Sequence, residues 1–318
     1  MDLLSLLVSA ICSFVAAYLF LPWLIKSLHG TPAVGKDLNK PDRPLVPEMG
    51  GLGVILGFYV GVAVLALFAL QEIPGSFYYA AVTAALGAGV VGLMDDMFTL
   101  RKRWKAALPF ILALPMGAVA YGSGNRVLLG VDIGVLIALA IPVGVTSAAN
   151  AANMLEGFNG LGAGLGVIMA VTLVVLSLLT SAEEGLFLLF PLIGALLAFL
   201  SFNRYPARVF PGDSMTLFTG ATLACAAIIS SPSMKAYGAL LFLPMIIEFA
   251  LKARGRFQAE NYGRAGSDGR LVWEGRIESV LHVIMRRRRL REWEVVLVAW
   301  AIEGVVCASV IVAVAAGL

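Results

Sequence analysis

The sequence predicts an all-α membrane protein, a polytopic bundle of about ten transmembrane helices. Of its 318 residues, 60% are hydrophobic and 14% are charged, and the mean hydropathy is +0.91. Apolar runs of about 20 residues, the length that crosses a bilayer, recur along the whole chain. No linker or low-complexity segment divides them, so residues 1–318 are expected to form a single integral membrane domain.

The apolar runs define the predicted spans in chain order. The first run has the length of a signal peptide, but it lacks a basic start and an obvious small-residue cleavage site, so we interpret it as a span. In the second run, Gly53, Gly57 and Gly61 form a small-residue face, which favours close packing in the bundle over a homodimer contact. Kinks are expected at the prolines inside the spans, Pro109, Pro115, Pro142 and Pro244. The predicted spans are 3–25, 49–70, 77–94, 106–121, 133–150, 161–180, 185–202, 214–230, 236–251 and 293–317.

The positions of lysine and arginine predict the orientation in the membrane. Of the 23 such residues, only Arg126 and Lys235 fall on one side of the predicted bundle, and all the others fall in alternate connections on the opposite side. By the positive-inside rule the basic side is cytoplasmic, and an even number of spans then puts both termini outside the cytoplasm. The expected location is the plasma membrane or the endoplasmic reticulum membrane.

The connection 252–292 is long enough to be a functional loop on the cytoplasmic side. Ser267-Asp268-Gly269 indicates a turn and hence a small hairpin. Apolar residues recur at helical spacing from Ile277 to Met285, which predicts an amphipathic interfacial helix that ends at Arg286-Arg287-Arg288-Arg289. Binding to anionic headgroups and a plain topology signal explain this basic end equally well.

The cysteines and histidines limit the kind of metal site that the chain can form. Cys12, Cys225 and Cys307 lie inside apolar spans without CxxC spacing, so they indicate small buried side chains with no disulfide or zinc site. His29 and His282 are too few and too far apart for a histidine-based site. Any metal is therefore expected to have oxygen ligands.

Adjacent carboxylates, Asp95 and Asp96, follow the apolar run 77–94, and the basic stretch 101–105 comes soon after them. Acids at the edge of a membrane span are costly to place there for packing alone. A carboxylate pair with cations beside it suits a divalent metal and phosphate groups. Solvated helix-end carboxylates are the weaker alternative.

Further polar side chains gather in the other predicted cytoplasmic connections, at 35–51, 150–161 and 202–214. Each cluster also has a purely structural interpretation. Asp213 precedes an apolar helix and can be its N-cap, and Asn150 and Asn153 share a helix face and can hydrogen-bond a neighbouring helix. The arginines of the last cluster are more readily topology signals than catalytic groups. Inside the apolar spans, interhelical hydrogen bonding is the expected role of Glu248 and Glu303.

These stretches resemble the polyprenyl-phosphate N-acetylhexosamine-1-phosphate transferases, the ten-helix membrane enzymes that begin N-glycan and bacterial wall-polymer assembly. The motifs run in the order and spacing of that family from about residue 35 to 256. They are Asp37-Leu38-Asn39-Lys40, Pro47-Glu48, Gly92-Leu-Met-Asp95-Asp96 with Lys105, Asn150-x-x-Asn153-x-x-x-Gly157-x-Asn159-Gly160-Leu161, and Asn203-x-Tyr205-Pro206-x-Arg208-Val209-Phe210-x-Gly212-Asp213.

The chain is most similar to the eukaryotic and archaeal branch of that family, which transfers GlcNAc-1-phosphate from UDP-GlcNAc to dolichyl phosphate. The bacterial wall branches carry a histidine-rich motif in the last cytoplasmic loop, where this chain has Arg254-Gly255-Arg256. Gly255 and Glu156 depart from the pattern of the dolichol enzymes. The same chemistry with another UDP-N-acetylhexosamine is therefore the alternative activity.

The resemblance implies a role for each matching residue and a Mg²⁺ cofactor, with Mn²⁺ as an alternative. Asp95, Asp96 and Lys105 would be catalytic, and Asn153 and Asp213 would bind the metal. Because a phosphate monoester has its second pKa near ~6, the lipid phosphate hardly needs a general base. The acids are therefore expected mainly to organise the metal, the nucleophile and the lysine. Lys105 and Asn150 would bind the lipid phosphate, and the UDP-sugar would contact Lys36, Asp37, Leu38, Glu48, Asn159, Arg254 and Arg256.

The expected partners are UDP-GlcNAc, a polyprenyl or dolichyl phosphate and membrane lipid, with a homodimer as a further option and no nucleic acid. A transporter is the rival class, since acids inside a membrane often mark ion pathways. However, transporter sites tend to lie at the bilayer midplane between repeated halves, and here the acids lie at one edge with no evident repeat. A structural scaffold gives no account of polar motifs gathered on one face.

Overall fold

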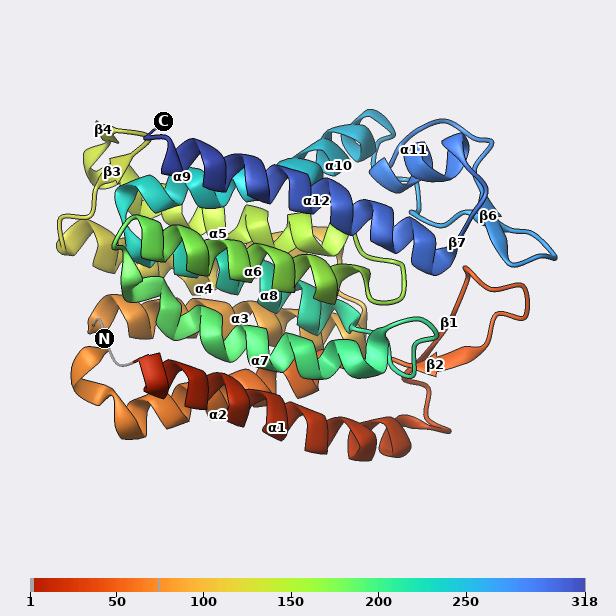
Figure 1. The fold of residues 1–318 in the computed structure, drawn as a ribbon, viewed down its shortest axis with the longest axis horizontal. Helices are drawn as coiled ribbons and strands as arrows, with labels where there is room; N and C mark the ends of the chain where they lie inside the picture. Colours follow the sequence, from red (N-terminus) through yellow and green to blue (C-terminus); the bar gives the residue numbers. More distant parts are fainter. Residues whose placement is uncertain (1–2, 74, 318) are drawn as a thin grey trace.

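The computed structural model describes residues 3–73 and 75–317, which form a bundle of long, nearly aligned helices (Figure 1). Within these residues, nine helices are long and apolar enough to cross a membrane. The long helices are α1 (Leu3–Leu28), α2 (Gly51–Phe68), α3 (Ser76–Phe98), α4 (Lys102–Gly122), α5 (Ile137–Met154), α6 (Leu161–Leu179), α7 (Leu186–Asn203), α8 (Gly212–Ser230) and α12 (Glu292–Ala315). The predicted fold class, an all-α polytopic bundle, is confirmed.

The predicted span at 236–251 is instead a broken pair of helices, α9 (Pro232–Leu241) and α10 (Leu243–Arg254), bent by 57°. The break falls at Phe242, and Pro244 lies in the first turn of α10, where a missing N–H costs nothing. The expected irregularity near Pro244 is thus confirmed. If the pair crosses the membrane as one unit, the described residues contain up to ten spans.

Short strands and one short helix occupy the connections. β1 (Val34–Lys36) pairs with β2 (Leu45–Pro47), and β3 (Val127–Leu128) pairs with β4 (Val131–Asp132). The predicted hairpin around Ser267-Asp268-Gly269 is present as β5 (Arg264–Ala265) and β6 (Arg270–Val272), with β7 (Leu290–Arg291) as a third strand. β1, β2, β6 and β7 lie at one end of the bundle, whereas both ends of the chain and the β3–β4 hairpin lie at the other (Figure 1).

The predicted amphipathic helix is α11 (Val280–Arg287), and its apolar side does not face lipid. Leu281, Ile284 and Met285 are buried against the rest of the chain. The interfacial interpretation was therefore wrong for the apolar face, because the periodicity that marks a membrane-surface helix also marks a helix packed on protein. The arginines at its end are exposed.

Close helix contacts at glycine set the architecture around the buried helix α8. A Cβ on Gly92 of α3 would collide with the backbone of Asp213 and Ser214, so this glycine allows the end of α3 to touch the first turn of α8. A Cβ on Gly220 would likewise collide with the backbone of α5 at Ala148. The ends of α3, α5 and α8 are thereby brought together.

The small-residue face of α2 packs inside the chain, as predicted. Gly53 faces Leu21 of α1, Gly57 lies against the backbone oxygen of Ser13, and Gly61 contacts Pro191 of α7. This face is buried against α1 and α7, so a homodimer would have to use another surface.

The helix that carries the paired acids is longer than the sequence predicts. α3 continues to Phe98, so Asp95 and Asp96 lie in its last turn instead of in the following loop. Thr99 then adopts a left-handed conformation, with φ of 51°, and its N–H bonds the carbonyl of Asp95 at 2.9 Å. Lys105 similarly lies inside the first turns of α4. A tight reversal from α3 to α4 therefore returns the lysine to the acids.

Candidate active site

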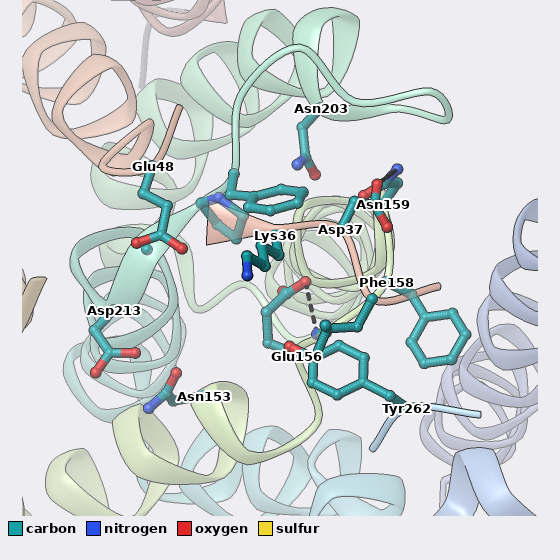
Figure 2. Close-up of a pocket in the computed structure, with 15 residues that line it drawn as sticks. Lys36, Asp37, Glu48, Asn153, Glu156, Phe158, Asn159, Asn203, Asp213 and Tyr262 are labelled. Atoms are coloured by element: carbon teal, nitrogen blue, oxygen red, sulfur yellow. Dashed lines mark hydrogen bonds between the residues drawn. The ribbon is translucent and has the colours of Figure 1, made fainter. Parts of the chain in front are cut away.

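A cavity of about 240 Å³ opens among the connections at the strand-bearing end of the bundle (Figure 2). Asp213 and Asn153 lie near each other on one side of it, and Asp37 and Asn159 lie on the opposite side (Figure 2). Its walls come from the segments around β1 and β2, the α5–α6 and α7–α8 connections and the loop after α10. The lining residues are Lys36, Asp37, Leu38, Glu48, Asn153, Glu156, Gly157, Phe158, Asn159, Asn203, Phe210, Pro211, Gly212, Asp213 and Tyr262.

The ammonium group of Lys105 sits among oxygen atoms from three helices. It donates to Asp95 Oδ2 of α3 at 3.0 Å and forms an ion pair with Asp213 Oδ2 of α8. With the Asn153 amide turned to satisfy its neighbours, its oxygen accepts from Lys105 Nζ at 2.9 Å and its nitrogen donates to Asp213 Oδ1 at 2.9 Å. Residues far apart in the sequence thus meet around one positive charge.

Asp96 has a different environment from its neighbour Asp95. Its carboxylate accepts the backbone N–H groups of Asp213, at 2.6 Å, and Ser214, at 3.1 Å. These N–H groups belong to the first turn of α8, where backbone amides have no partner within the helix, and no side chain of that turn caps them. The helix dipole also favours a negative charge there. Asp96 therefore caps α8 from another helix, and the N-cap interpretation of Asp213 was wrong.

Because Asp96 accepts the backbone N–H groups of the first turn of α8, the Asp213 carboxylate is free to face Lys105 and the cavity. Gly212, with φ of +67°, permits the approach, since a Cβ there would meet the Asp96 carboxylate. Glu48 lies nearby on the cavity wall. Burial, with the charge of Asp96 as a second cause, raises the pKa of Glu48 above its ordinary value.

A second buried network holds the opposite wall. Asp37 Oδ2 accepts from Asn159 Nδ2 at 3.1 Å and also pairs with Lys40. Glu292, the first residue of α12, accepts the backbone N–H of Asn159 at 2.9 Å and pairs with Lys40 at 3.3 Å. Asp37, Asn159 and Glu292 are at most 5% exposed. The network ties the β1–β2 connection and the α5–α6 connection to α12.

Further bonds fix the turns that carry these residues. Asn203 Oδ1 accepts the N–H of Gly160 at 3.0 Å, and its nitrogen donates to Val209 O at 2.9 Å. Position 160 favours glycine, because its φ of +87° is one that other residues rarely adopt. The Asn203 motif therefore supports the cavity wall through the backbone.

The end of α10 and the loop after it hold the end of α5, and the loop closes one side of the cavity. Lys252 Nζ donates to Met154 O at 2.7 Å, and Asn261 Nδ2 donates to Met154 O at 2.9 Å and to Glu156 O at 2.6 Å. Tyr262 follows directly and lines the cavity. The segment after Asn153 is thus held by contacts from the 252–292 loop.

Some of the predicted site residues do not reach the cavity wall. Arg254 is exposed, and its guanidinium donates to the carbonyl of Ile277. Arg256 is exposed in a left-handed conformation, with φ of 56°. Asn150 donates to Thr146 O of its own helix at 2.9 Å. Their roles in substrate binding stay predictions.

Several cavity residues were not singled out as site residues from the sequence. Glu156 was noted only as a departure, yet it lines the cavity with Oε1 on the N–H of Gly157 at 3.2 Å. Its Oε2 is enclosed and has no hydrogen-bond partner among the residues that the structure describes. Burial raises the pKa of Glu156 to about 7. Phe158, Phe210 and Tyr262 gave no chemical signal in the sequence, and Glu292 looked like an ordinary acid at the start of a span.

The oxygen atoms around Lys105 fit a hard divalent cation. Two carboxylates and one amide, from Asp95, Asp213 and Asn153, already converge on a positive charge. Mg²⁺ prefers such ligands, and it usually completes its octahedron with phosphate oxygens and water. In residues 3–73 and 75–317, no cluster of three or more His, Cys, Asp or Glu side chains forms a metal cage. The residues therefore suit an ion that is shared with a phosphate substrate.

Residues 78–231 match the model of glycosyl transferase family 4. A protein of Saccharolobus solfataricus, provisionally named UDP-N-acetylglucosamine–dolichyl-phosphate N-acetylglucosaminephosphotransferase, is 35% identical over 96% of this chain and 95% of its own length. The Saccharomyces cerevisiae protein with that name is 28% identical over 77% and 67%, respectively. A phospho-N-acetylmuramoyl-pentapeptide-transferase of Limosilactobacillus reuteri is 29% identical over 72% and 76%.

Proposed function

The chain belongs to glycosyl transferase family 4, and we propose that it transfers GlcNAc-1-phosphate from UDP-GlcNAc to a polyprenyl phosphate such as dolichyl phosphate. The products are polyprenyl-diphospho-GlcNAc and UMP. The reaction is the first step of lipid-linked glycan assembly. The two archaeal relatives that match 95% or more of the chain carry the name of this activity, which favours it over the wall-polymer alternative.

One observation carries the proposal: Lys105 lies between Asp95 and Asp213 with Asn153 beside them, and two of these residues, Asn153 and Asp213, line a polar cavity. Both substrates are anionic at neutral pH, so their phosphates repel each other until positive charge is placed between them. Asp213 and Asn153 would hold Mg²⁺, or Mn²⁺, and the ion would supply part of that charge when bound.

The residues of the chain then have separate tasks in the transfer. An oxygen of the lipid phosphate attacks the phosphorus that carries the sugar, and the bond between that phosphorus and the bridging oxygen of UMP breaks. Lys105 would hold the lipid phosphate, because a lysine attracts phosphate as a point charge. Asp95 orients Lys105, and Asp96 fixes the first turn of α8 so that Asp213 faces the same point. UMP would leave to the cytoplasmic side.

The opposite wall would bind the nucleotide. Lys36, Asp37, Leu38 and Asn159 line the cavity, and Asp37 and Asn159 also bind each other and so shape this wall. Glu48 lines the cavity on the side of Asp213 (Figure 2). The basic connections support a cytoplasmic position for this face, with the termini on the other side of the membrane.

A transfer assay with the purified protein in detergent tests the proposal. Radiolabelled UDP-GlcNAc and polyprenyl phosphate should give a labelled lipid product in the presence of Mg²⁺, and removal of the metal with EDTA should abolish it. UDP-MurNAc-pentapeptide should not replace UDP-GlcNAc. A preference for the muropeptide nucleotide would assign the chain to the wall-polymer branch, and no lipid product with any UDP-N-acetylhexosamine would refute the transferase activity.

A further inference from the structure

Six arginines form an exposed surface on the loop that closes the cavity. They come from β6, from the end of α11 and from the segment that leads into α12, and we call them the arginine surface: Arg270, Arg286, Arg287, Arg288, Arg289 and Arg291. Arg270 and Arg291 are direct partners across the β6–β7 pair. Like charges placed opposite each other in a sheet are destabilising. The arrangement therefore favours an anion.

The acids near the arginine surface do not neutralise it. Asp268 pairs with Arg270 at 3.8 Å, and both side chains are more than half exposed, so this pair is weak. Glu292 is buried and engaged by Lys40 and Asn159. Glu294 accepts the backbone N–H of Arg291 at 2.7 Å. Among the described residues, no other ion pair involves these arginines.

The surface lies beside the end of a helix that is long and apolar enough to cross a membrane. Arg291 directly precedes α12, a membrane-spanning helix, and Trp293 in its first turn is 40% exposed, as is common for interfacial tryptophan. α11, β6 and β7 lie at this end of α12 (Figure 1). Because α11 buries its apolar face on protein, its arginines extend from a rigid support.

The same segment also builds the cavity. β7 leads directly into Glu292, which binds Asn159 and Lys40. β6 pairs with β5, and β5 begins two residues after Tyr262, which lines the cavity. We propose that the arginine surface binds the headgroups of anionic membrane lipids and so holds the 255–291 loop in place over the cavity. The polybasic character, the missing counter-charges and the membrane boundary identify this ligand.

Lipid retention by the full-length protein tests the binding. The protein would be purified in detergent with fluorescent phosphatidylglycerol or fluorescent phosphatidylcholine, and the bound lipid would be measured after washing. Wild type should retain the anionic lipid in preference. The Arg288→Gln/Arg289→Gln variant should retain roughly tenfold less of it, and Arg288→Lys/Arg289→Lys should retain most of it, because the attraction is one of charge.

The matched control is Arg101→Gln/Arg103→Gln, which removes equal charge from exposed arginines of another basic connection. This control should keep wild-type retention. Equal loss of retained anionic lipid in both double variants would mean that the net charge of the protein alone attracts the lipid. Undiminished retention in Arg288→Gln/Arg289→Gln would mean that these arginines act only as a topology signal. Either result would overturn the proposal.

A second measurement addresses the loop and rests on the proposed transferase function. In nanodiscs, transfer by wild type should rise several-fold when phosphatidylglycerol is added to phosphatidylcholine, whereas the Gln variant should keep the same basal rate and lose this rise. An equal rise in the Gln variant would exclude the effect on the loop. Lipid retention requires no transfer, so the failure of either idea can be recognised separately.

Discussion

At the scale of single residues, adjacent Asp95 and Asp96 have different tasks, because one faces Lys105 and the other caps α8. This division separates the consequences of mutating Asp96 from those of mutating Asp213. Sequence adjacency alone could not reveal it, since it depends on Gly92 allowing α3 to touch α8.

Asp96→Ala should lower the stability of the folded protein by about 1 kcal/mol or more, because it leaves the amides of the first turn of α8 without a cap. Asp213→Asn should stay folded, because Lys105 keeps its ion pair with Asp95 and Asp96 keeps its bonds to the first turn of α8, yet it should lose most transfer activity. Thermal unfolding in detergent and the transfer rate, measured on both variants, test this pair. Near-full activity of Asp213→Asn would remove Asp213 from the metal and phosphate site.

Glu156 gives a prediction about pH. Its pKa is raised from 4.5 to about 7 by burial, so between these values the folded protein keeps a proton that the unfolded chain has lost. Stability contributed by the protonated group is therefore lost as the pH rises through this window, and it changes no further above it. Glu156→Gln cannot ionise, so it should gain stability relative to wild type across the window, by at most about 3 kcal/mol. Parallel stability profiles for the two proteins would contradict this.

The residues that sequence reasoning found and missed differ in a physical way. Asp213 and Asn153 stand in motifs whose polar atoms are out of place beside apolar spans, so their chemistry is visible in the sequence. Glu292 and Tyr262 become site residues only through contacts across the fold, with Asn159 and with the cavity. The predicted substrate roles of the exposed Arg254 and Arg256 came from a resemblance alone.

At the scale of elements, the last turns of α10 and the loop after it hold the end of α5. Lys252→Met should reduce the transfer rate about tenfold, because Met154 O loses a charged donor next to Asn153. A matched control is Lys235→Met. Lys235 is also largely buried, and it donates to Asn125 Oδ1 at 2.5 Å and Val127 O at 2.9 Å, at the opposite end of the bundle.

Lys235→Met should lower thermal stability and leave the activity of the folded protein unchanged. Wild-type activity in Lys252→Met, or equal losses of activity in both variants, would show that the α5 contact does not position the site. A change in kcat without a matching change in UDP-GlcNAc affinity is expected for Lys252→Met, since Lys252 does not line the cavity.

Hydrophobic length predicts most of the helices well, because a span must satisfy its backbone within apolar surroundings. It fails at the helix ends. The sequence predicts that Asp95 and Asp96 lie in a connection, because they are charged, although their backbone is still part of helix α3. Hydrophobic length alone also gives no sign of the bend at Phe242, which divides one apolar run into α9 and α10; only Pro244 indicated an irregularity there.

At the scale of the whole molecule, the sequence predicts that the polar motifs share one side of the bundle, and the structure gathers most of them around one cavity. The motif order says nothing about which connection touches which. That pairing depends on helix packing, such as α8 against α3 and α5, and on small residues whose spacing alone names no partner. Local chemistry is therefore easier to predict than the contacts between distant connections.

The buried contacts of Glu292 have a consequence for how the protein is made. During synthesis, Asp95 and Asp96 of α3 and Asp213 of α8 are made before α12. The first residue of α12, Glu292, binds Asn159 and Lys40. A nascent chain that lacks α12 therefore has the charged centre around Lys105, but the wall that we propose to bind the nucleotide lacks these contacts. We therefore expect the enzyme to become competent only after α12 has been made, so chains truncated before α12 should not consume sugar nucleotide.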